Sequence, residues 1–173
     1  MKPKSDLPQS TYYATSNCSL GSVLIAASEV GLCSVLLADT PDALVREAQK
    51  RFSHAQSAQK DKKLEKLVAT VIGVIEKPTK HFSVPLDLQG TLFQKQVWRA
   101  LQKIPLGKTA TYTDIAKRIG KPKSARAVAQ ACAANTIAVL IPCHRVIRSD
   151  GSLSGYRWGV QRKEALLERE QGK

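Results

Sequence analysis

The chain of 173 residues carries a formal net charge of +13, and nearly all of this excess lies in its second half. Residues 91–173 hold 16 Lys and Arg against 5 Asp and Glu, whereas residues 1–90 hold 11 against 9. This asymmetry favours a polyanionic partner, because neutralising phosphates releases counterions and supplies most of the non-specific affinity for DNA. A membrane surface is disfavoured, because no basic amphipathic stripe with Trp or Phe on its opposite face is found and no apolar run is long enough to span a bilayer.

The first half of the sequence combines short strands with helices. Strands are predicted over residues 12–15, 23–27 and 32–37. Helices are predicted over 41–52 and 64–75, the second because its apolar residues recur at helical spacing. A polar linker over 53–63 separates the two helices, and the chain is expected to enter a second domain near residue 90.

The second half is predicted to be mainly helical and to contain a helix-turn-helix. Thr91 and Gln94 form a capping box for its first helix. Thr113 is expected to cap a short helix, and Ser124 to cap another over roughly 124–134. This last helix is rich in alanine, whose side chain is too small to hold a backbone away from a DNA groove. It is typical of a recognition helix, although close packing against other helices explains the alanines too.

One face of this alanine-rich helix is polar. Arg126 and Gln130 stand four residues apart and share a face, while Val128 and Cys132 share another. Contacts with DNA are expected from Arg126 and Gln130 on this face, from the small neighbouring Ala125 and Ala127, and from Tyr112.

Residues 141–147 place Cys143 directly before His144 and Arg145 within an apolar run. A free thiol has a pKa of about 8.5 and needs a proton acceptor or a nearby positive charge to act as a nucleophile. In an extended strand, neighbouring side chains point to opposite faces, so Cys143 and His144 would need a bridging water or a bend after Pro142 to interact. A buried structural cysteine is the alternative interpretation, since free Cys is among the most buried residue types.

Glu170 stands three and four positions beyond Leu167 and Leu166, on the face of a C-terminal helix that is expected to be buried. A buried carboxylate needs a partner, and His144 is the partner that we expect. A solvated helix end is the alternative.

Together these motifs resemble the O6-alkylguanine-DNA alkyltransferases, most closely the C-terminal domain of the bacterial Ada proteins and the Ogt type. The resemblance is strongest over residues 126–135, 141–147 and 151–170, and it extends through 91–98 and 107–112 and more weakly through the first half. It implies an α/β architecture, in which an N-terminal ribonuclease-H-like support domain over 1–90 lacks the metal site of ribonuclease H. A mainly helical C-terminal domain over 91–173 then carries a winged-helix-like helix-turn-helix and the alkyl acceptor.

The resemblance also implies direct-reversal DNA repair. Cys143 would take the alkyl group from O6 of a flipped-out guanine in one irreversible displacement, so that each molecule reacts once. His144 would act on the thiol through a water, and Glu170 would orient its imidazole. Tyr112 would give a proton or hydrogen bond to the departing guanine, and Asn135 would tie the recognition helix to the active-site strand.

Base flipping is required because the alkyl carbon lies inside the base stack, out of reach of a thiolate. By resemblance, Arg126 fills the gap that the rotated nucleotide leaves. The wall of the base pocket and the loop that covers it are assigned to Val146, Leu153, Tyr156 and Arg157. Ala138 and Trp158 are assigned to the same pocket. Relatives that accept benzyl adducts tend to carry Pro and Gly at these two positions, so we expect efficient transfer of methyl groups and poor transfer of benzyl groups.

No cofactor or metal is expected, because the four cysteines show no paired spacing typical of a disulfide framework or a zinc site. The expected partner is double-stranded DNA containing O6-alkylguanine, bound by a monomer in a reducing, cytoplasmic compartment without membrane association. Two other functions stay open. A DNA-binding damage sensor without chemistry explains the charge and the helix pair, whereas a cysteine hydrolase explains the Cys and His but not the basic half.

Overall fold

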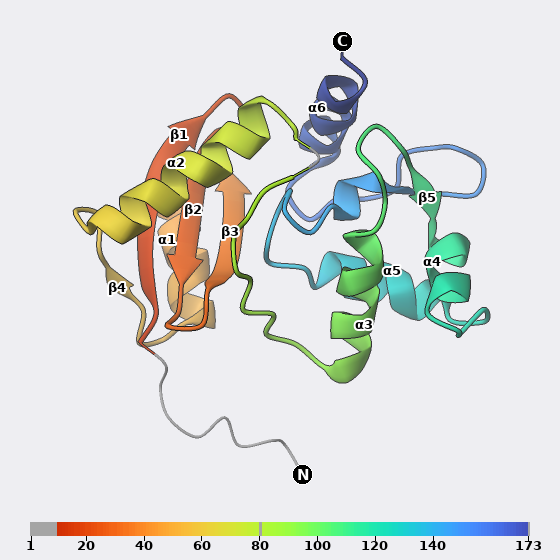
Figure 1. The fold of residues 1–173 in the computed structure, drawn as a ribbon, viewed down its shortest axis with the longest axis horizontal. Helices are drawn as coiled ribbons and strands as arrows, with labels where there is room; N and C mark the ends of the chain where they lie inside the picture. The colour runs from red at the N-terminus through yellow and green to blue at the C-terminus, as the bar shows by residue number, and fades with distance from the viewer. Residues whose placement is uncertain (1–9, 80, 173) are drawn as a thin grey trace.

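The computed structural model describes residues 10–79 and 81–172, and it divides into a sheet-based half and a helical half (Figure 1). In the first half, β1 (Tyr12–Cys18), β2 (Gly21–Ala27) and β3 (Leu32–Ala38) form an antiparallel meander. The three predicted strands are confirmed, each one to three residues longer than predicted. The predicted linker was partly wrong, because it contains a short strand, β4 (Gln56–Ser57), that pairs in parallel with β1 and completes the order β3-β2-β1-β4.

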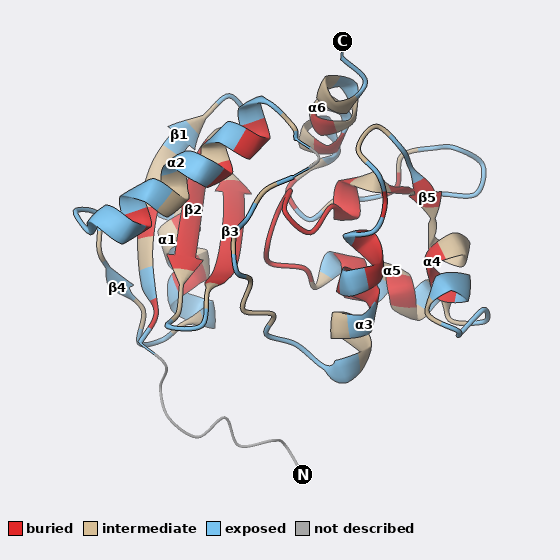
Figure 2. Ribbon diagram, viewed as in Figure 1, coloured by how far each residue is buried: buried red, intermediate tan, exposed pale blue. Residues whose placement is uncertain are grey.

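Two helices cover this sheet, α1 (Pro41–Arg51) behind it and α2 (Lys62–Glu76) in front of it in Figure 1. Each helix begins at a side-chain cap, and the Asp61 carboxylate accepts a hydrogen bond from the Leu64 N–H at 2.8 Å at the start of α2. Cover on both faces explains why β2 and β3 are continuous apolar runs rather than alternating ones. Figure 2 shows these two strands almost entirely buried.

The second half is mainly helical, as predicted. Its elements are α3 (Leu92–Leu101), β5 (Ala110–Thr111), α4 (Tyr112–Arg118), α5 (Ala125–Ala133), the 3-10 turn η1 (Cys143–Arg145), β6 (Val146–Ile147) and α6 (Val160–Glu170). The predicted capping box of α3 is confirmed, because the N–H groups of Thr91 and Gln94 each donate to the side chain of the other. α3 packs on α5, and the indole N–H of Trp98 donates to the Ala131 carbonyl at 2.9 Å.

The helix-turn-helix consists of α4 and α5, but the predicted cap of α4 was wrong. Thr111, not Thr113, is the N-cap, because its hydroxyl accepts from the Asp114 N–H while the Asp114 carboxylate accepts from the Thr111 N–H. Tyr112 therefore becomes the first residue of the helix. Ser124 does precede α5, but its hydroxyl donates to the Lys121 carbonyl instead of capping the helix.

The two halves join along the outer edge of β3. The Val35 N–H donates to the Thr136 carbonyl at 2.8 Å, and the Ala138 N–H donates to the Val35 carbonyl at 3.0 Å. Leu32 forms a similar bridge with Leu86, on the segment that enters the helical half. The segment that follows α5 is thus held by the sheet of the first half.

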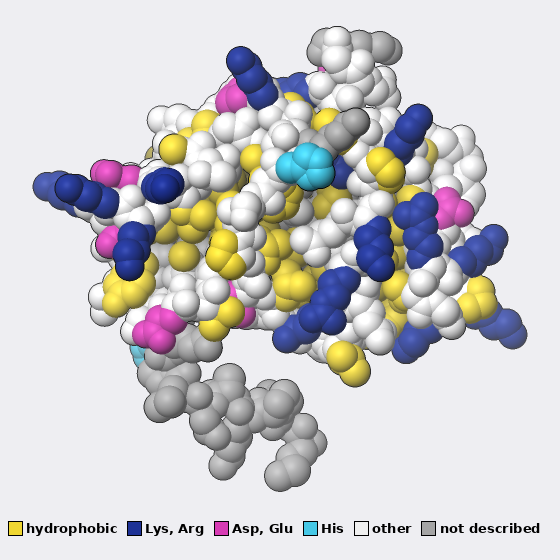
Figure 3. All heavy atoms as spheres, in the orientation of Figure 1, with side chains coloured by type: hydrophobic (Ala, Val, Ile, Leu, Met, Phe, Trp, Pro, Cys, Tyr) yellow, Lys and Arg dark blue, Asp and Glu magenta, His cyan; other side chains and the backbone are white. Residues whose placement is uncertain are grey.

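Basic side chains gather over the helical half, whereas acidic ones are sparse there (Figure 3). This distribution agrees with the charge asymmetry of the sequence. Within residues 10–79 and 81–172, none of the helices has the length and apolar character needed to cross a membrane.

Candidate functional site

A cavity of about 690 Å³ opens between the helix-turn-helix and the loop that precedes α6. Its wall combines the start of α4, one face of α5, the first residue of η1 and the 148–157 loop. The lining residues are Tyr112, Thr113, Ala125, Arg126, Ala129, Cys132, Ala133, Cys143, Arg148, Ser149, Ser154, Gly155, Tyr156 and Arg157. The structure therefore brings the predicted thiol, phenol and recognition-helix arginine around one cavity.

Cys143 lies at the inner wall with only 5% of its surface exposed. The chain is not extended at this point, and the bend that was one of the two alternatives is present. Pro142 adopts φ −80° and ψ 60°, the Cys143 N–H donates to the Ile141 carbonyl at 2.8 Å, and η1 follows. These angles are those of an inverse γ-turn, which a proline accommodates because its ring fixes φ near this value. The bend after Pro142 thus removes the alternation that would have separated Cys143 from His144.

Asn135 organises the backbone that carries the thiol. Its Nδ2 donates to the carbonyls of Ile137 and Ile141 at 3.3 and 3.1 Å and to Cys143 Sγ at 3.3 Å. Its Oδ1 accepts from the Ile137 N–H at 2.9 Å. The side chain is fully buried directly after α5, so it ties the end of this helix to the turns that carry Cys143.

The loop between Asn135 and Cys143 contains a strained residue. Val139 has φ 68°, a value that β-branched residues rarely adopt, and the Leu140 N–H donates to the Ala138 carbonyl across it at 2.7 Å. Strained backbone of this kind persists only where surrounding contacts enforce it. Here the Asn135 hydrogen bonds and the β3 junction supply those contacts.

The Cys143 thiol is protonated in the resting protein. Burial raises its pKa to about 11, although the hydrogen bond from Asn135 and the charge of Lys163 act in the opposite direction. Since the thiolate is the nucleophilic form, a proton acceptor must take the thiol proton before or during a reaction.

His144 is fully buried and forms the expected pair with Glu170, whose side chain is only 2% exposed. His144 Nε2 lies 2.7 Å from Glu170 Oε1. Burial lowers the pKa of His144 below its ordinary value even though Glu170 raises it, so the imidazole is neutral near pH 7. Because Nε2 donates to the carboxylate, the lone pair of the neutral ring is on Nδ1. This buried atom has no hydrogen-bond partner in residues 10–79 and 81–172, which leaves it free to accept a proton.

Arg145 completes this cluster and was not assigned a role from the sequence. Its Nε and Nη2 donate to the Glu170 carboxylate at 2.8 to 3.1 Å, and its Nη1 donates to the Ile104 carbonyl at 2.7 Å. Burial raises the pKa of Glu170, but the hydrogen bonds from His144 and Arg145 outweigh this effect and lower the pKa to about 2. The carboxylate therefore stays ionised and holds the imidazole and the guanidinium together.

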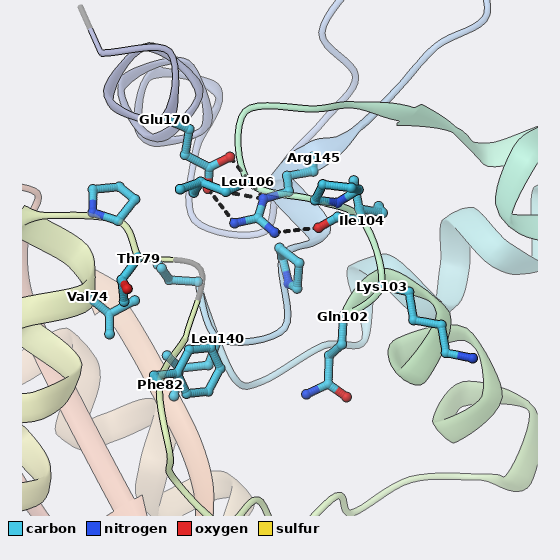
Figure 4. Close-up of a pocket in the computed structure, with 14 residues that line it drawn as sticks. Val74, Thr79, Phe82, Gln102, Lys103, Ile104, Leu106, Leu140, Arg145 and Glu170 are labelled. Atoms are coloured by element: carbon cyan, nitrogen blue, oxygen red, sulfur yellow. Dashed lines mark hydrogen bonds and ion pairs between the residues drawn. The ribbon is translucent and has the colours of Figure 1, made fainter.

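Behind this cluster lies a second cavity of about 380 Å³ between the two halves of the molecule (Figure 4). Figure 4 shows Glu170 and Arg145 on one side of it and Val74, Thr79 and Phe82 of the first half on the other. Glu170 and Arg145 thus border the interdomain cavity, whereas Cys143, next to His144 in the chain, lines the larger one.

Four residues predicted to line the pocket lie outside the lining. Ala138 and Val146 are fully buried, the first at the β3 junction and the second in β6. Leu153 is half-buried in the loop, and Trp158 is buried with its ring 5.2 Å from that of Tyr156 in an edge-on contact. In this structure these four residues therefore lie behind or beside the lining, and their part in the base pocket stays a prediction. Trp158 contacts two lining residues, Tyr156 through this ring contact and Arg157, whose guanidinium carbon lies 5.8 Å from the centre of its ring.

The predicted DNA-contacting residues share the outward part of α5. Arg126 and Gln130 are exposed, Ala125 and Ala127 are half-buried, and Val128 and Cys132 face inward. Arg157, at the mouth of the cavity, donates to the Ala133 carbonyl at 3.3 Å and pairs with Glu47 of α1 at 2.6 Å. The loop that covers the cavity is therefore fastened both to the end of α5 and to the first half.

In the two described stretches of the chain, no group of three or more His, Cys, Asp or Glu side chains is arranged to hold a metal ion.

Comparison with known proteins gives two matching family models. Residues 11–88 match the ribonuclease-like domain of 6-O-methylguanine DNA methyltransferase, and residues 92–172 match the DNA-binding domain of the same family.

Individual relatives agree with these matches. The chain is 51% identical to the bifunctional transcriptional activator/DNA repair enzyme Ada of Escherichia coli over 91% of its own length and 45% of that protein. It therefore spans about half the length of this relative and of the similar regulatory protein ada of Salmonella typhimurium. It is 42% identical to the inducible methylated-DNA--protein-cysteine methyltransferase of Bacillus subtilis, over 84% of this chain and 82% of that one.

A solved structure shows the same architecture. The crystal structure of Mycobacterium tuberculosis OGT in complex with DNA superposes with a TM-score of 0.80 at 35% identity, covering 93% of each chain. The α/β fold with a mainly helical second half is confirmed by this likeness.

Proposed function

Because this chain belongs to the 6-O-methylguanine DNA methyltransferase family, we propose that it repairs DNA by transferring the O6-alkyl group of a damaged guanine to its own Cys143. The observation that carries the proposal is a single arrangement. A buried thiol faces a cavity beside a recognition helix, next to a histidine whose free Nδ1 is set by an ionised carboxylate.

The reaction consists of one displacement. A bridging water passes the thiol proton of Cys143 to Nδ1 of His144, and Glu170 stabilises the imidazolium that forms. Sγ attacks the alkyl carbon as the bond from that carbon to O6 breaks, and the bonding electron pair stays on the guanine. Tyr112 gives the departing base a proton or hydrogen bond. The thioether is stable, so each molecule reacts once.

DNA is bound by the helix-turn-helix. Ala125, Arg126, Ala127 and Gln130 meet the groove, and the basic residues of the helical half contact phosphates. Flipping costs a few kcal/mol and less for a base whose pairing is already impaired, so O6-alkylguanine is extracted more readily than guanine. Arg126, exposed on α5 and at the mouth of the cavity, fills the space that the flipped nucleotide leaves.

The proposal extends to the organisation of the chain. Residues 1–90 support residues 91–173, which bind DNA and accept the alkyl group. The protein acts as a monomer on double-stranded DNA containing O6-alkylguanine and works in the cytoplasm. The four free cysteines support a reducing compartment.

Intact-protein mass spectrometry with a duplex containing one O6-methylguanine tests the proposal. We expect a mass gain of one methylene that saturates at one per protein and maps to Cys143. Cys132 is an internal control, because it lines the same cavity but burial raises its pKa further. Tight binding without any mass gain would instead support the alternative function, a damage-binding protein without chemistry. Labelling at Cys132 would contradict the assigned nucleophile.

A further inference from the structure

The buried side chain of Lys163 takes no part in the mechanism above, although a single residue, Ser154, connects it to Tyr112. Lys163 on α6 is fully buried. Its Nζ donates to the Val146 carbonyl at 2.6 Å and to Ser154 Oγ at 3.1 Å. Among the described residues no carboxylate pairs with it, and burial lowers its pKa. Burying a charge without a countercharge is unfavourable, so this lysine calls for an explanation other than stability.

Ser154 connects this lysine to the cavity. Its hydroxyl is buried and has two hydrogen-bond partners in the described part of the chain, Lys163 and the phenol of Tyr112. Tyr112 and Ser154 both line the cavity that holds Cys143. Lys163, Ser154 and Tyr112 therefore form one polar chain from the core to the place where the base would lie.

The chemistry of these groups fixes the direction of the hydrogens. An ammonium group only donates, so Ser154 Oγ accepts from Lys163. If Ser154 also accepted from Tyr112, its own hydrogen would be buried without an acceptor, which is unfavourable. Donation from Ser154 to Tyr112 avoids this loss and leaves the phenolic hydrogen of Tyr112 free for another acceptor.

We propose that Lys163 and Ser154 are positioning residues that turn the phenolic hydrogen of Tyr112 toward the flipped guanine. This proposal rests on the proposed function and explains how the hydrogen that Tyr112 gives to the departing guanine is oriented. As the bond between the alkyl carbon and O6 breaks, negative charge builds up on the guanine and the Tyr112 hydrogen moves to it. The phenolate oxygen that remains is stabilised by the Ser154 O–H, which the Lys163 ammonium polarises.

The test is a set of single-turnover transfer rates on an O6-methylguanine duplex. Ser154→Ala removes the hydroxyl with little change in volume, and Ser154→Thr retains it. Ser152→Ala is the matched control, because Ser152 is an exposed serine of the same loop whose hydroxyl donates to Asp150 and which does not line the cavity. We expect Ser154→Ala to slow transfer roughly tenfold, a part of the 10²- to 10⁴-fold that a positioned proton donor typically supplies. Ser154→Thr should restore most of the rate, and Ser152→Ala should leave it unchanged.

Repeating the Ser154→Ala substitution in a Tyr112→Phe protein shows whether Ser154 acts by positioning Tyr112 or only by supporting the structure. In a Tyr112→Phe protein there is no phenolic hydrogen to orient, so adding Ser154→Ala should change the rate less than about twofold. Lys163→Met should slow transfer, and combining it with Ser154→Ala should slow it little further. Affinity for the duplex is measured alongside each rate and should not change.

The outcomes distinguish the two levels of the proposal. If the unmodified chain transfers methyl and Ser154→Ala is as fast, or if Ser154→Ala slows both backgrounds equally, the positioning role is overturned while the proposed function stands. If the unmodified chain does not transfer methyl at all, both are overturned.

Discussion

Replacing Glu170 with Gln tests the cluster that orients the proposed base. The substitution keeps the size of the side chain but removes the charge that His144 and Arg145 share. A glutamine amide can present its NH2 group to either partner, and two donors then face each other. We expect transfer to slow by about 10- to 100-fold, because general-base contributions of 10²–10⁴ depend on correct orientation of the base. Affinity for undamaged DNA should stay within about twofold, since Glu170 lies behind the cavity and outside its lining.

The loss of stability can be worked out from the pKa of the carboxyl. Glu170 has its pKa lowered from 4.5 to about 2, and a shift of this size corresponds to about 3 kcal/mol of favourable interaction with the ionised form. The side chain is only 2% exposed, so solvent screens little of it. Since the folded-state pKa is lowered, this contribution is complete above pH 4.5 and disappears as the pH falls through about 2. Glu170→Gln should therefore lower the free energy of unfolding by about 2 to 3 kcal/mol at pH 7, and by progressively less toward pH 2.

The assay combines single-turnover transfer rates with urea unfolding at a series of pH values. Glu168→Gln is the matched control, because Glu168 is exposed on the same helix. An unchanged transfer rate in the Glu170→Gln protein would refute the orienting role of this carboxylate. A stability difference that stays constant down to pH 2 would refute the reasoning from the pKa.

Three further substitutions test other parts of the site. Arg126→Ala should slow transfer about 100-fold, since extrusion of a base costs a few kcal/mol, but should weaken binding to an undamaged duplex by less than about fivefold; equal losses in the two measurements would make Arg126 a phosphate contact. Asn135→Ala should lower the free energy of unfolding by about 2 to 4 kcal/mol in urea titrations, because it leaves several buried groups unpaired, and a loss no larger than that of a substitution at the exposed Asn17 would contradict this. Benzyl transfer should be much slower than methyl transfer in the unmodified chain, and Trp158→Gly should narrow the gap by letting Tyr156 move back; comparable rates on both lesions before substitution would disprove the size limit.

The elements of the fold could be predicted where one local pattern dominates. Short strand-forming runs separated by glycine turns located β1 to β3, and helical periodicity located α1 and α2. Side-chain capping chemistry located the start of α3. Periodicity also placed Glu170 on a buried face, which led to its pairing with His144.

Other features depend on contacts between distant segments, which a local pattern does not reveal. The apolar run around Cys143 has strand composition, but Pro142 and the Asn135 hydrogen bonds fold it into turns. The partners of Arg145 and Lys163 come from elsewhere in the chain, although one signal was available. Lys163 is three residues before Leu166 and seven before Glu170, so it shares the buried face of α6.

The junction at β3 has a consequence for aggregation. An outer strand with free N–H and C=O groups is a template for pairing with other chains, and β3 is long and apolar. Leu86 and residues 136–138 occupy that edge, so the helical half acts as a cover for the sheet. A fragment cut near residue 90 would retain every strand of the sheet but expose much of this edge. Keeping this edge covered therefore requires more of the chain than the sheet itself, and the loop that covers it leads directly to the thiol.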